Sequence, residues 1–130
     1  MRKFKIYFLL GVVSILSLAT VLQSETSALS CSNTYLRKGT TNYECVKVAQ
    51  RNFNQWACPG QALAVDGSYG PITRAAITAF QADYNVNNSY FGASDILVDG
   101  ITGPQTWAAF DRYAYWDFVL TPTMGHCISY

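Results

Sequence analysis

Apolar side chains recur at helical spacing in three separate segments of this 130-residue chain. The first segment predicts a helix from about Thr41 to Trp56, because one face repeats at i, i+3, i+4 and i+7. These positions are Val46, Ala49, Gln50 and Phe53. Thr41 and Glu44 fit a capping box at the start, with Thr41 bonding forward and Glu44 reaching back. Cys58-Pro59-Gly60 predicts the end of this helix.

The other two segments each begin at a Gly-Pro pair. Glycine is acceptable at the N-cap, and proline fits the first helical position, where a missing N–H costs nothing. After Pro71 the apolar positions are Ile72, Ala76, Ile77 and Phe80, and after Pro104 they are Trp107, Phe110 and Tyr113. The predicted fold class is therefore all-α, a small bundle of three short helices.

A sequence repeat precedes both of these helices. The segments 65–76 and 98–109 share the frame VDGxxGPxTxAA. An Asp-Gly pair predicts a tight turn, because the carboxylate accepts from nearby backbone N–H groups and glycine tolerates positive φ. We therefore expect one turn-to-helix unit used twice. Its structural turn residues are Asp66, Gly67, Gly70, Asp99, Gly100 and Gly103.

The N-terminal segment has the pattern of a secretory signal peptide. Arg2, Lys3 and Lys5 precede an apolar run from Ile6 to about Leu22, and small residues ending at Ala28 follow. We expect cleavage after Ala28. A retained membrane anchor is the first alternative, although the apolar run is only marginally long enough to span a membrane. A lipoprotein modified at Cys31 is the second alternative.

Charge and cysteine content narrow the class of protein and the partners that the sequence allows. Beyond residue 28 there are six basic and seven acidic side chains, which gives no reason to expect a nucleic-acid partner or an anionic membrane surface. All four cysteines also lie there, and an even number in a small exported domain indicates two disulfides. The sequence alone leaves three pairings open. A straight helix would hold Cys45 and Cys58 about 19 Å apart, so pairing them requires the Pro59-Gly60 loop to fold back.

Three stretches together carry a family resemblance: LRKGTTNYECVKVAQRNF, LAVDGSYGPITRAAITAFQ and LVDGITGPQTWAAF. They resemble the peptidoglycan-binding domain of the type 1, three-helix family from about Leu36 to Phe110. Asn42 replaces the second glycine of the family's opening turn, and Ala49 replaces a leucine. A loop longer than the family norm is expected at residues 85–94.

The N-terminal pattern and the resemblance together imply a division of the chain. We expect a signal peptide at 1–28, an N-terminal segment at 29–35, the domain at 36–112 and an aromatic C-terminal extension at 113–130. Because some family members close their termini with a disulfide, Cys31 is expected to pair with Cys127 and Cys45 with Cys58.

Candidate ligand contacts come from residues that helix packing explains least. Tyr69 lies in the first repeat turn and Tyr90 in the expected loop, and tyrosine suits polar, ring-containing ligands. Trp107 opens the last helix, and Gln81 occupies a recurring family position, as does Gln50. The competing interpretation is packing for the aromatic residues and hydrogen bonding to interhelical backbone groups for the two glutamines. His126, the single histidine, is interpreted as an exposed tail residue.

The resemblance implies non-catalytic binding of bacterial cell-wall peptidoglycan by a secreted or wall-associated protein. We expect no catalytic residue, cofactor or metal site, no membrane partner after signal cleavage, and a monomer. The protein either binds alone or works with a separately encoded cell-wall hydrolase. A small secreted hydrolase or its accessory subunit, and a protein-interaction module that reuses the fold, are the alternatives.

Overall fold

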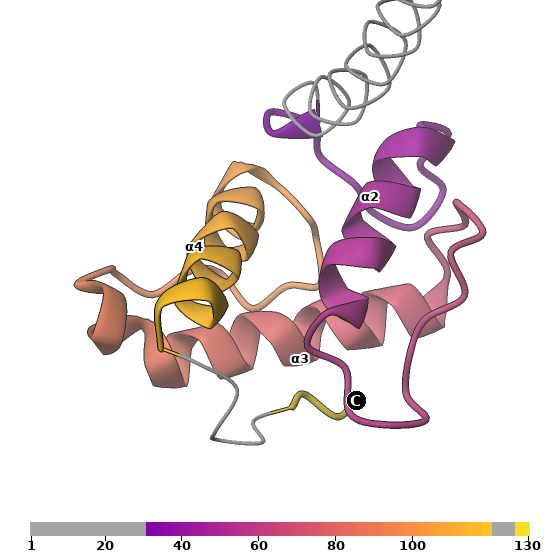
Figure 1. Cartoon of the computed structure of the whole chain (residues 1–130). Helices are drawn as coiled ribbons and strands as arrows, with labels where there is room; N and C mark the ends of the chain where they lie inside the picture. Colours follow the sequence, from indigo (N-terminus) through magenta and orange to yellow (C-terminus); the bar gives the residue numbers. More distant parts are fainter. Residues whose placement is uncertain (1–30, 121–126) are drawn as a thin grey trace, which may run out of the picture. The chain divides into compact units, whose positions relative to one another are not determined.

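A computed structural model describes residues 31–120 and 127–130. In this part of the chain three α-helices follow one another: α2 (Tyr43–Asn54), α3 (Pro71–Asn87) and α4 (Pro104–Leu120). A short 3-10 helix, η1 (Asn88–Phe91), continues from α3 (Figure 1). The all-α fold class is confirmed. The predicted signal peptide and His126 lie outside the described residues.

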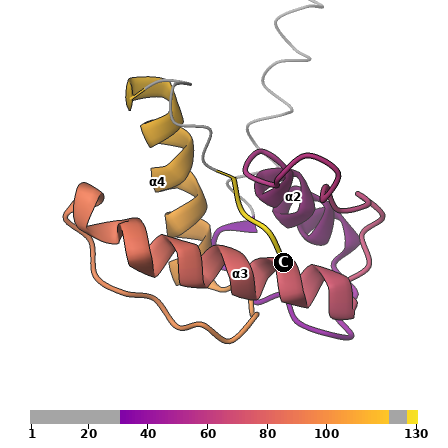
Figure 2. The ribbon, with the colours of Figure 1, turned by 90° about the horizontal axis from the view of Figure 1, so that it is seen from below.

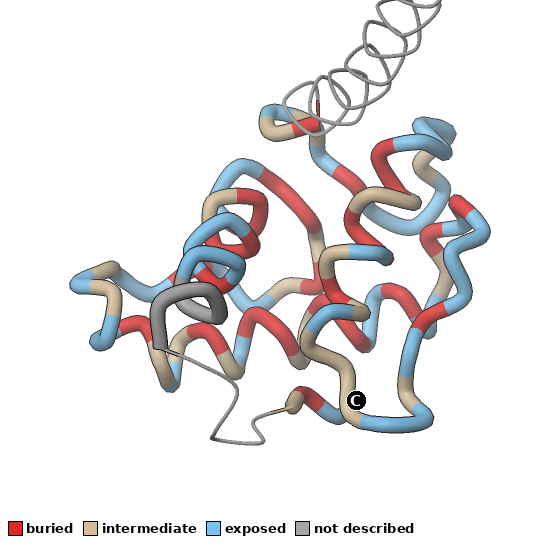
Figure 3. The backbone as a smooth tube through the Cα atoms, viewed as in Figure 1, coloured by how far each residue is buried: buried red, intermediate tan, exposed pale blue. Residues whose placement is uncertain are grey.

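Helix α3 is the element on which the other two helices pack. Figures 1 and 2 show α2 over the first half of α3 and α4 over its second half, on the same side. In Figure 3 each of the three helices carries buried segments. On α3, for example, the fully buried Ala76, Ile77 and Phe80 fall at helical spacing. The apolar stripes that the sequence predicts thus form one core.

The start of α2 differs from the predicted capping box. Asn42 is the N-cap, and its side-chain oxygen accepts from the N–H of Cys45 at 3.3 Å. Glu44 forms an ion pair with Lys47 at 2.9 Å, so it does not reach back to Thr41. Asparagine is as good an N-cap as threonine, and here it displaces the cap by one residue.

Aromatic rings fill the space between α3 and α4. The ring centroids of Phe80 and Phe110 lie 4.3 Å apart, and Tyr113 contacts Phe80, Tyr84 and Trp56. Tyr113 is fully buried and belongs to α4, which continues to Leu120. Helix α4 thus runs past residue 112, where we expect the domain to end from the sequence.

The segment expected to be a long loop at 85–94 is mostly helical. Asn85 is still part of α3, and η1 covers Asn88–Phe91. The ring of Phe91 stacks on Tyr84 at 5.9 Å between centroids, so packing onto the core extends the helical path.

The structure corrects the expected disulfide pairing. Cys31 pairs with Cys45, and Cys58 pairs with Cys127, with Cα separations of 5.5 and 4.7 Å. The pairs Cys31–Cys127 and Cys45–Cys58 are wrong because Cys45 and Cys58 lie at opposite ends of α2, which keeps them too far apart. The C-terminal segment instead runs beside the end of α2. There the Cys58 N–H donates to Ile128 O at 3.0 Å, and the Ile128 N–H donates to Trp56 O at 2.7 Å.

Candidate functional site

The first Asp-Gly turn is held by a buried glutamine of α2. Gln50 Nε2 donates to Asp66 Oδ1 at 2.9 Å and to Ser68 O at 3.1 Å, while its Oε1 accepts from Gly67 N at 3.1 Å. Asp66 Oδ1 also accepts from Ser68 N at 2.8 Å. Gly67 has φ of 77°, in the left-handed region that glycine adopts without strain.

The second turn repeats this arrangement one helix later. Gln81 of α3 donates to Asp99 Oδ1 at 3.2 Å and to Ile101 O at 2.9 Å, and its Oε1 accepts from Gly100 N at 2.8 Å. Gly100 has φ of 69°. Gly70 and Gly103, the second glycines of the frame, precede Pro71 and Pro104 at the starts of α3 and α4. In both copies a helix fixes the turn that starts the next helix.

A second repeated contact was missed from the sequence. Asn54 donates to Leu63 O at 2.8 Å and accepts from Leu63 N at 2.6 Å. Asn85 makes the same pair of bonds with Ile96, both at 2.8 Å. Each asparagine lies four residues after the glutamine of its helix. The shared spacing QxxxN was the available signal.

Tyr69 connects the two turns. Its hydroxyl donates to Gly100 O at 2.9 Å and lies 3.1 Å from Thr102 Oγ1. Burial raises the pKa of the Tyr69 phenol to about 12. The hydrogen bond from Ser68 N–H, and then that from Gln50, lower the pKa of the Asp66 carboxyl. These shifts favour a neutral Tyr69 phenol and an ionised Asp66 carboxylate at neutral pH.

Three of the four candidate ligand contacts lie inside the domain. Tyr69 is 3% exposed, Trp107 is 5% exposed and Gln81 is 1% exposed. Trp107 Nε1 donates to Thr34 O at 2.9 Å. Burial leaves these three side chains little surface for contact with a polymeric ligand. Tyr90 on η1 is 71% exposed and remains a candidate.

The residues before α2 form a surface turn that the sequence did not single out as a ligand site. Leu36 is fully buried and pairs with Thr102, with reciprocal backbone bonds of 2.9 and 3.0 Å. The chain then turns: Thr40 N donates to Arg37 O at 2.9 Å, and Arg37 N donates to Thr40 Oγ1 at 2.9 Å. Gly39 has φ of 86°. We call residues 35–42 the opening turn.

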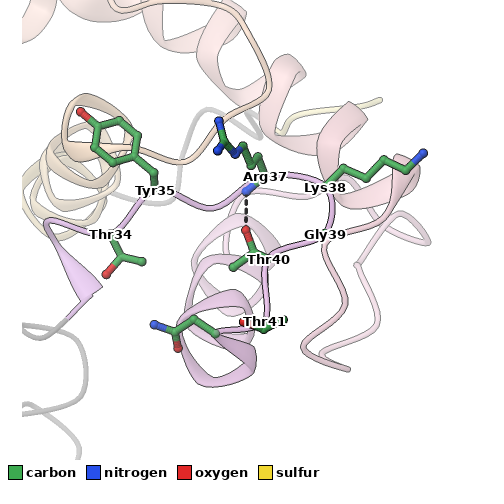
Figure 4. Close-up of a pocket in the computed structure, with 8 residues that line it drawn as sticks. Thr34, Tyr35, Arg37, Lys38, Gly39, Thr40 and Thr41 are labelled. Atoms are coloured by element: carbon green, nitrogen blue, oxygen red, sulfur yellow. Dashed lines mark hydrogen bonds between the residues drawn. The ribbon is translucent and has the colours of Figure 1, made fainter.

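Two depressions meet at this turn. The larger, of about 480 Å³, is lined by residues 34–42 of the chain except Leu36 (Figure 4). The smaller, of about 170 Å³, lies between the opening turn and the second Asp-Gly turn. Its lining residues are Arg37, Lys38, Arg74, Asp99, Gly100 and Ile101. Figure 4 shows Tyr35, Arg37 and Lys38 extending away from Thr41.

Residues 31–120 and 127–130 contain no group of three or more His, Cys, Asp or Glu side chains placed to hold a metal ion. None of the helices in these ranges is long and apolar enough to cross a membrane. All four cysteines are in disulfides.

A family model matches part of the chain. Residues 42–89 match the model of the family described as "Putative peptidoglycan binding domain". The family resemblance is therefore confirmed for α2, the first Asp-Gly turn and α3. Zinc D-Ala-D-Ala carboxypeptidase of Streptomyces albus G is 34% identical over 64 residues, which are 49% of this chain and 21% of that protein. The chain thus matches about a fifth of this relative's length. No solved structure shows significant similarity to the chain.

Proposed function

We propose that this protein binds cell-wall peptidoglycan without cleaving it. The observation that carries the proposal is the family match at residues 42–89, which falls on the part of the chain where α2 fixes the first turn and the start of α3. The two disulfides and the family together indicate an extracytoplasmic location. In this proposal the mature protein is a secreted or wall-associated monomer.

The carboxypeptidase relative supports a link to wall enzymes. The matched segment is 21% of that protein, and its printed name describes an enzyme acting on D-Ala-D-Ala. We propose that the present chain supplies attachment, alone or beside a separately encoded hydrolase. Incubating the purified protein with sacculi tests both parts: attachment predicts protein in the pellet and no released fragments. Released muropeptides would instead support the hydrolase alternative.

Of the four ligand contacts predicted from the sequence, Tyr90 is the exposed one. It lies on η1, beyond the end of α3, whereas Arg74 lies in the first turn of α3. A helix of 17 residues is about 25 Å long, so these two residues mark separate surfaces. Single substitutions at Tyr90 and at Arg74 therefore test different contact regions.

A further inference from the structure

The smaller depression concentrates the positive charge of the domain. Arg37, Lys38 and Arg74 all line it, and they are three of the six basic residues that follow residue 28. All three are exposed. Within residues 31–120 and 127–130, the ion pair that is formed joins Lys47 and Glu44, and it involves none of these three cations. The cations therefore face solvent without a carboxylate bound to them in this part of the chain.

The single acidic group at the depression is already engaged. Asp99 Oδ1 accepts from Ile101 N at 2.8 Å and from Gln81 Nε2 at 3.2 Å. These bonds hold the carboxylate in the turn, where it fixes the backbone. The depression as a whole carries a net positive charge of two, from three cations and one anion.

Hydrogen bonds and close packing hold the backbone that presents the cations. The hydrogen-bonded turn from Arg37 to Thr40 fixes the first two cations, and the pairing of Leu36 with Thr102 fixes the turn against the second repeat. Arg74 lies on α3, and its side chain packs so closely on Gly100 that a Cβ there would lie 2.7 Å from Arg74 Cγ. Prior ordering of this kind lowers the entropic cost of binding.

We infer that this depression binds carboxylate groups of the peptidoglycan stem peptide. The inference rests on the proposed function and names the part of the polymer that is recognised. Stem peptides carry free carboxylates, whereas the sugar rings are mostly neutral and hydroxylated. Two guanidinium groups and an ammonium match carboxylates, because arginine donates two parallel hydrogen bonds to one carboxylate.

The charge of the whole domain favours a short peptide over an anionic wall polymer. Proteins that bind polyanions carry a large positive excess, but here six basic residues are set against seven acidic ones beyond residue 28. A local excess of two positive charges fits a ligand with one or two carboxylates. Tyr35, 66% exposed, lines the larger depression, which shares Arg37 and Lys38 with this one.

The test uses soluble fragments and two matched arginine variants. Disaccharide-peptide fragments released from sacculi by a muramidase are titrated into the mature protein and followed by NMR. We expect Arg37→Gln and Arg74→Gln to weaken binding about tenfold each, with an unchanged melting temperature. Arg51→Gln is the control, because Arg51 is an exposed arginine of α2 outside both depressions. We expect it to bind like wild type.

Ligand variants separate the outcomes. Fragments whose carboxylates are converted to amides should bind as weakly as the arginine variants do. Equal binding of the amidated fragment would overturn the inference in favour of glycan recognition. Loss of wild-type binding after phosphate polymers are stripped from sacculi would overturn it in favour of a polyanion. Wild-type binding to stripped sacculi with unaffected arginine variants would reject this site and leave the proposed function intact.

Discussion

Gln50 and Gln81 occupy equivalent positions on consecutive helices, and each holds the Asp-Gly turn that follows its own helix. The sequence separation from glutamine to aspartate is 16 in the first copy and 18 in the second, so the second connection is slightly longer. The offset between the two glutamines also relates Asn54 to Asn85, and Tyr43 to Arg74. Tyr43 packs closely against Gly67 in the first copy, and Arg74 packs closely against Gly100 in the second. The duplication therefore includes the helix as well as the turn.

Replacing Gln81 with Ala should destabilise the domain strongly. The substitution leaves the N–H groups of Asp99 and Gly100 without their side-chain acceptor, and at least Gly100 is buried. Leaving buried donors unpaired costs about 1 to 3 kcal/mol each, so we expect a loss of about 2 to 4 kcal/mol in the free energy of unfolding. Chemical denaturation measures it.

The matched variants are Gln50→Ala and Gln55→Ala. Gln50 accepts from one turn N–H, that of Gly67, and its replacement should cost about 1 to 3 kcal/mol. Gln55 is exposed at the end of α2, and its replacement should change stability by less than about 0.5 kcal/mol. Equal stability of all three variants would show that the glutamines do not hold the turns.

Alanine substitutions at four glycines should form a graded series. Gly70 has open space and an ordinary φ, so alanine should be tolerated there. Gly39 has positive φ but open space, which costs about 1 kcal/mol. Gly67 and Gly100 also have positive φ, and there the added Cβ would meet neighbouring atoms. It would lie 3.1 Å from Tyr43 at Gly67 and 2.6 Å from Thr78 Oγ1 at Gly100. We expect Gly100→Ala to cost about 2 kcal/mol or more.

Melting temperatures establish the order of this series. Gly100 should be the most sensitive position, followed by Gly67, Gly39 and Gly70. If Gly67→Ala and Gly100→Ala keep the stability of wild type but lose wall binding, these glycines belong to the ligand site and their structural role is wrong.

Stability should fall in alkaline solution because of Tyr69. Its pKa in the folded domain, about 12, is above the ordinary value of 10.0, since burial disfavours the phenolate. The resulting stabilisation is fully present below pH 10 and is lost as the pH rises towards 12. Tyr69→Phe should reduce the slope of unfolding free energy against pH in this window. An identical slope for the variant and wild type would contradict this role.

The two disulfides should differ in their contribution to stability. Cys58–Cys127 closes a sequence separation of 69, whereas Cys31–Cys45 closes one of 14. In the chain-entropy model these loops correspond to about 4 and about 3 kcal/mol. Serine at both positions of a pair should therefore lower the melting temperature more for Cys58–Cys127. Non-reducing peptide mapping checks the pairing, and a Cys45–Cys58 peptide would refute it.

Local chemistry explains why much of the fold follows from the sequence. Helical spacing predicted all three helices, and Gly-Pro pairs predicted that α3 and α4 begin at Pro71 and Pro104. Asp-Gly pairs predict the positive φ observed at Gly67 and Gly100. These signals are local, because they depend on residues within a few positions of one another.

The missed features depend on contacts between distant segments. The disulfide pairing expected from the family resemblance is wrong because the C-terminal segment pairs at Ile128 with Ala57. Ala57 lies far earlier in the chain, so no local signal predicts this contact. Tyr69 was expected at the surface, but its hydroxyl reaches Gly100 in the other repeat. The cationic depression joins the opening turn to α3 and the second turn, which the pairing of Leu36 with Thr102 brings together.

Sedimentation with purified sacculi tests the central proposal most directly. The mature, oxidised protein is mixed with increasing amounts of peptidoglycan stripped of protein and anionic polymers, and both pellet and supernatant are quantified. We predict saturable transfer of protein to the pellet, no transfer to cellulose, and no release of soluble muropeptides. A folded protein that stays in the supernatant with sacculi of several chemotypes would contradict peptidoglycan attachment.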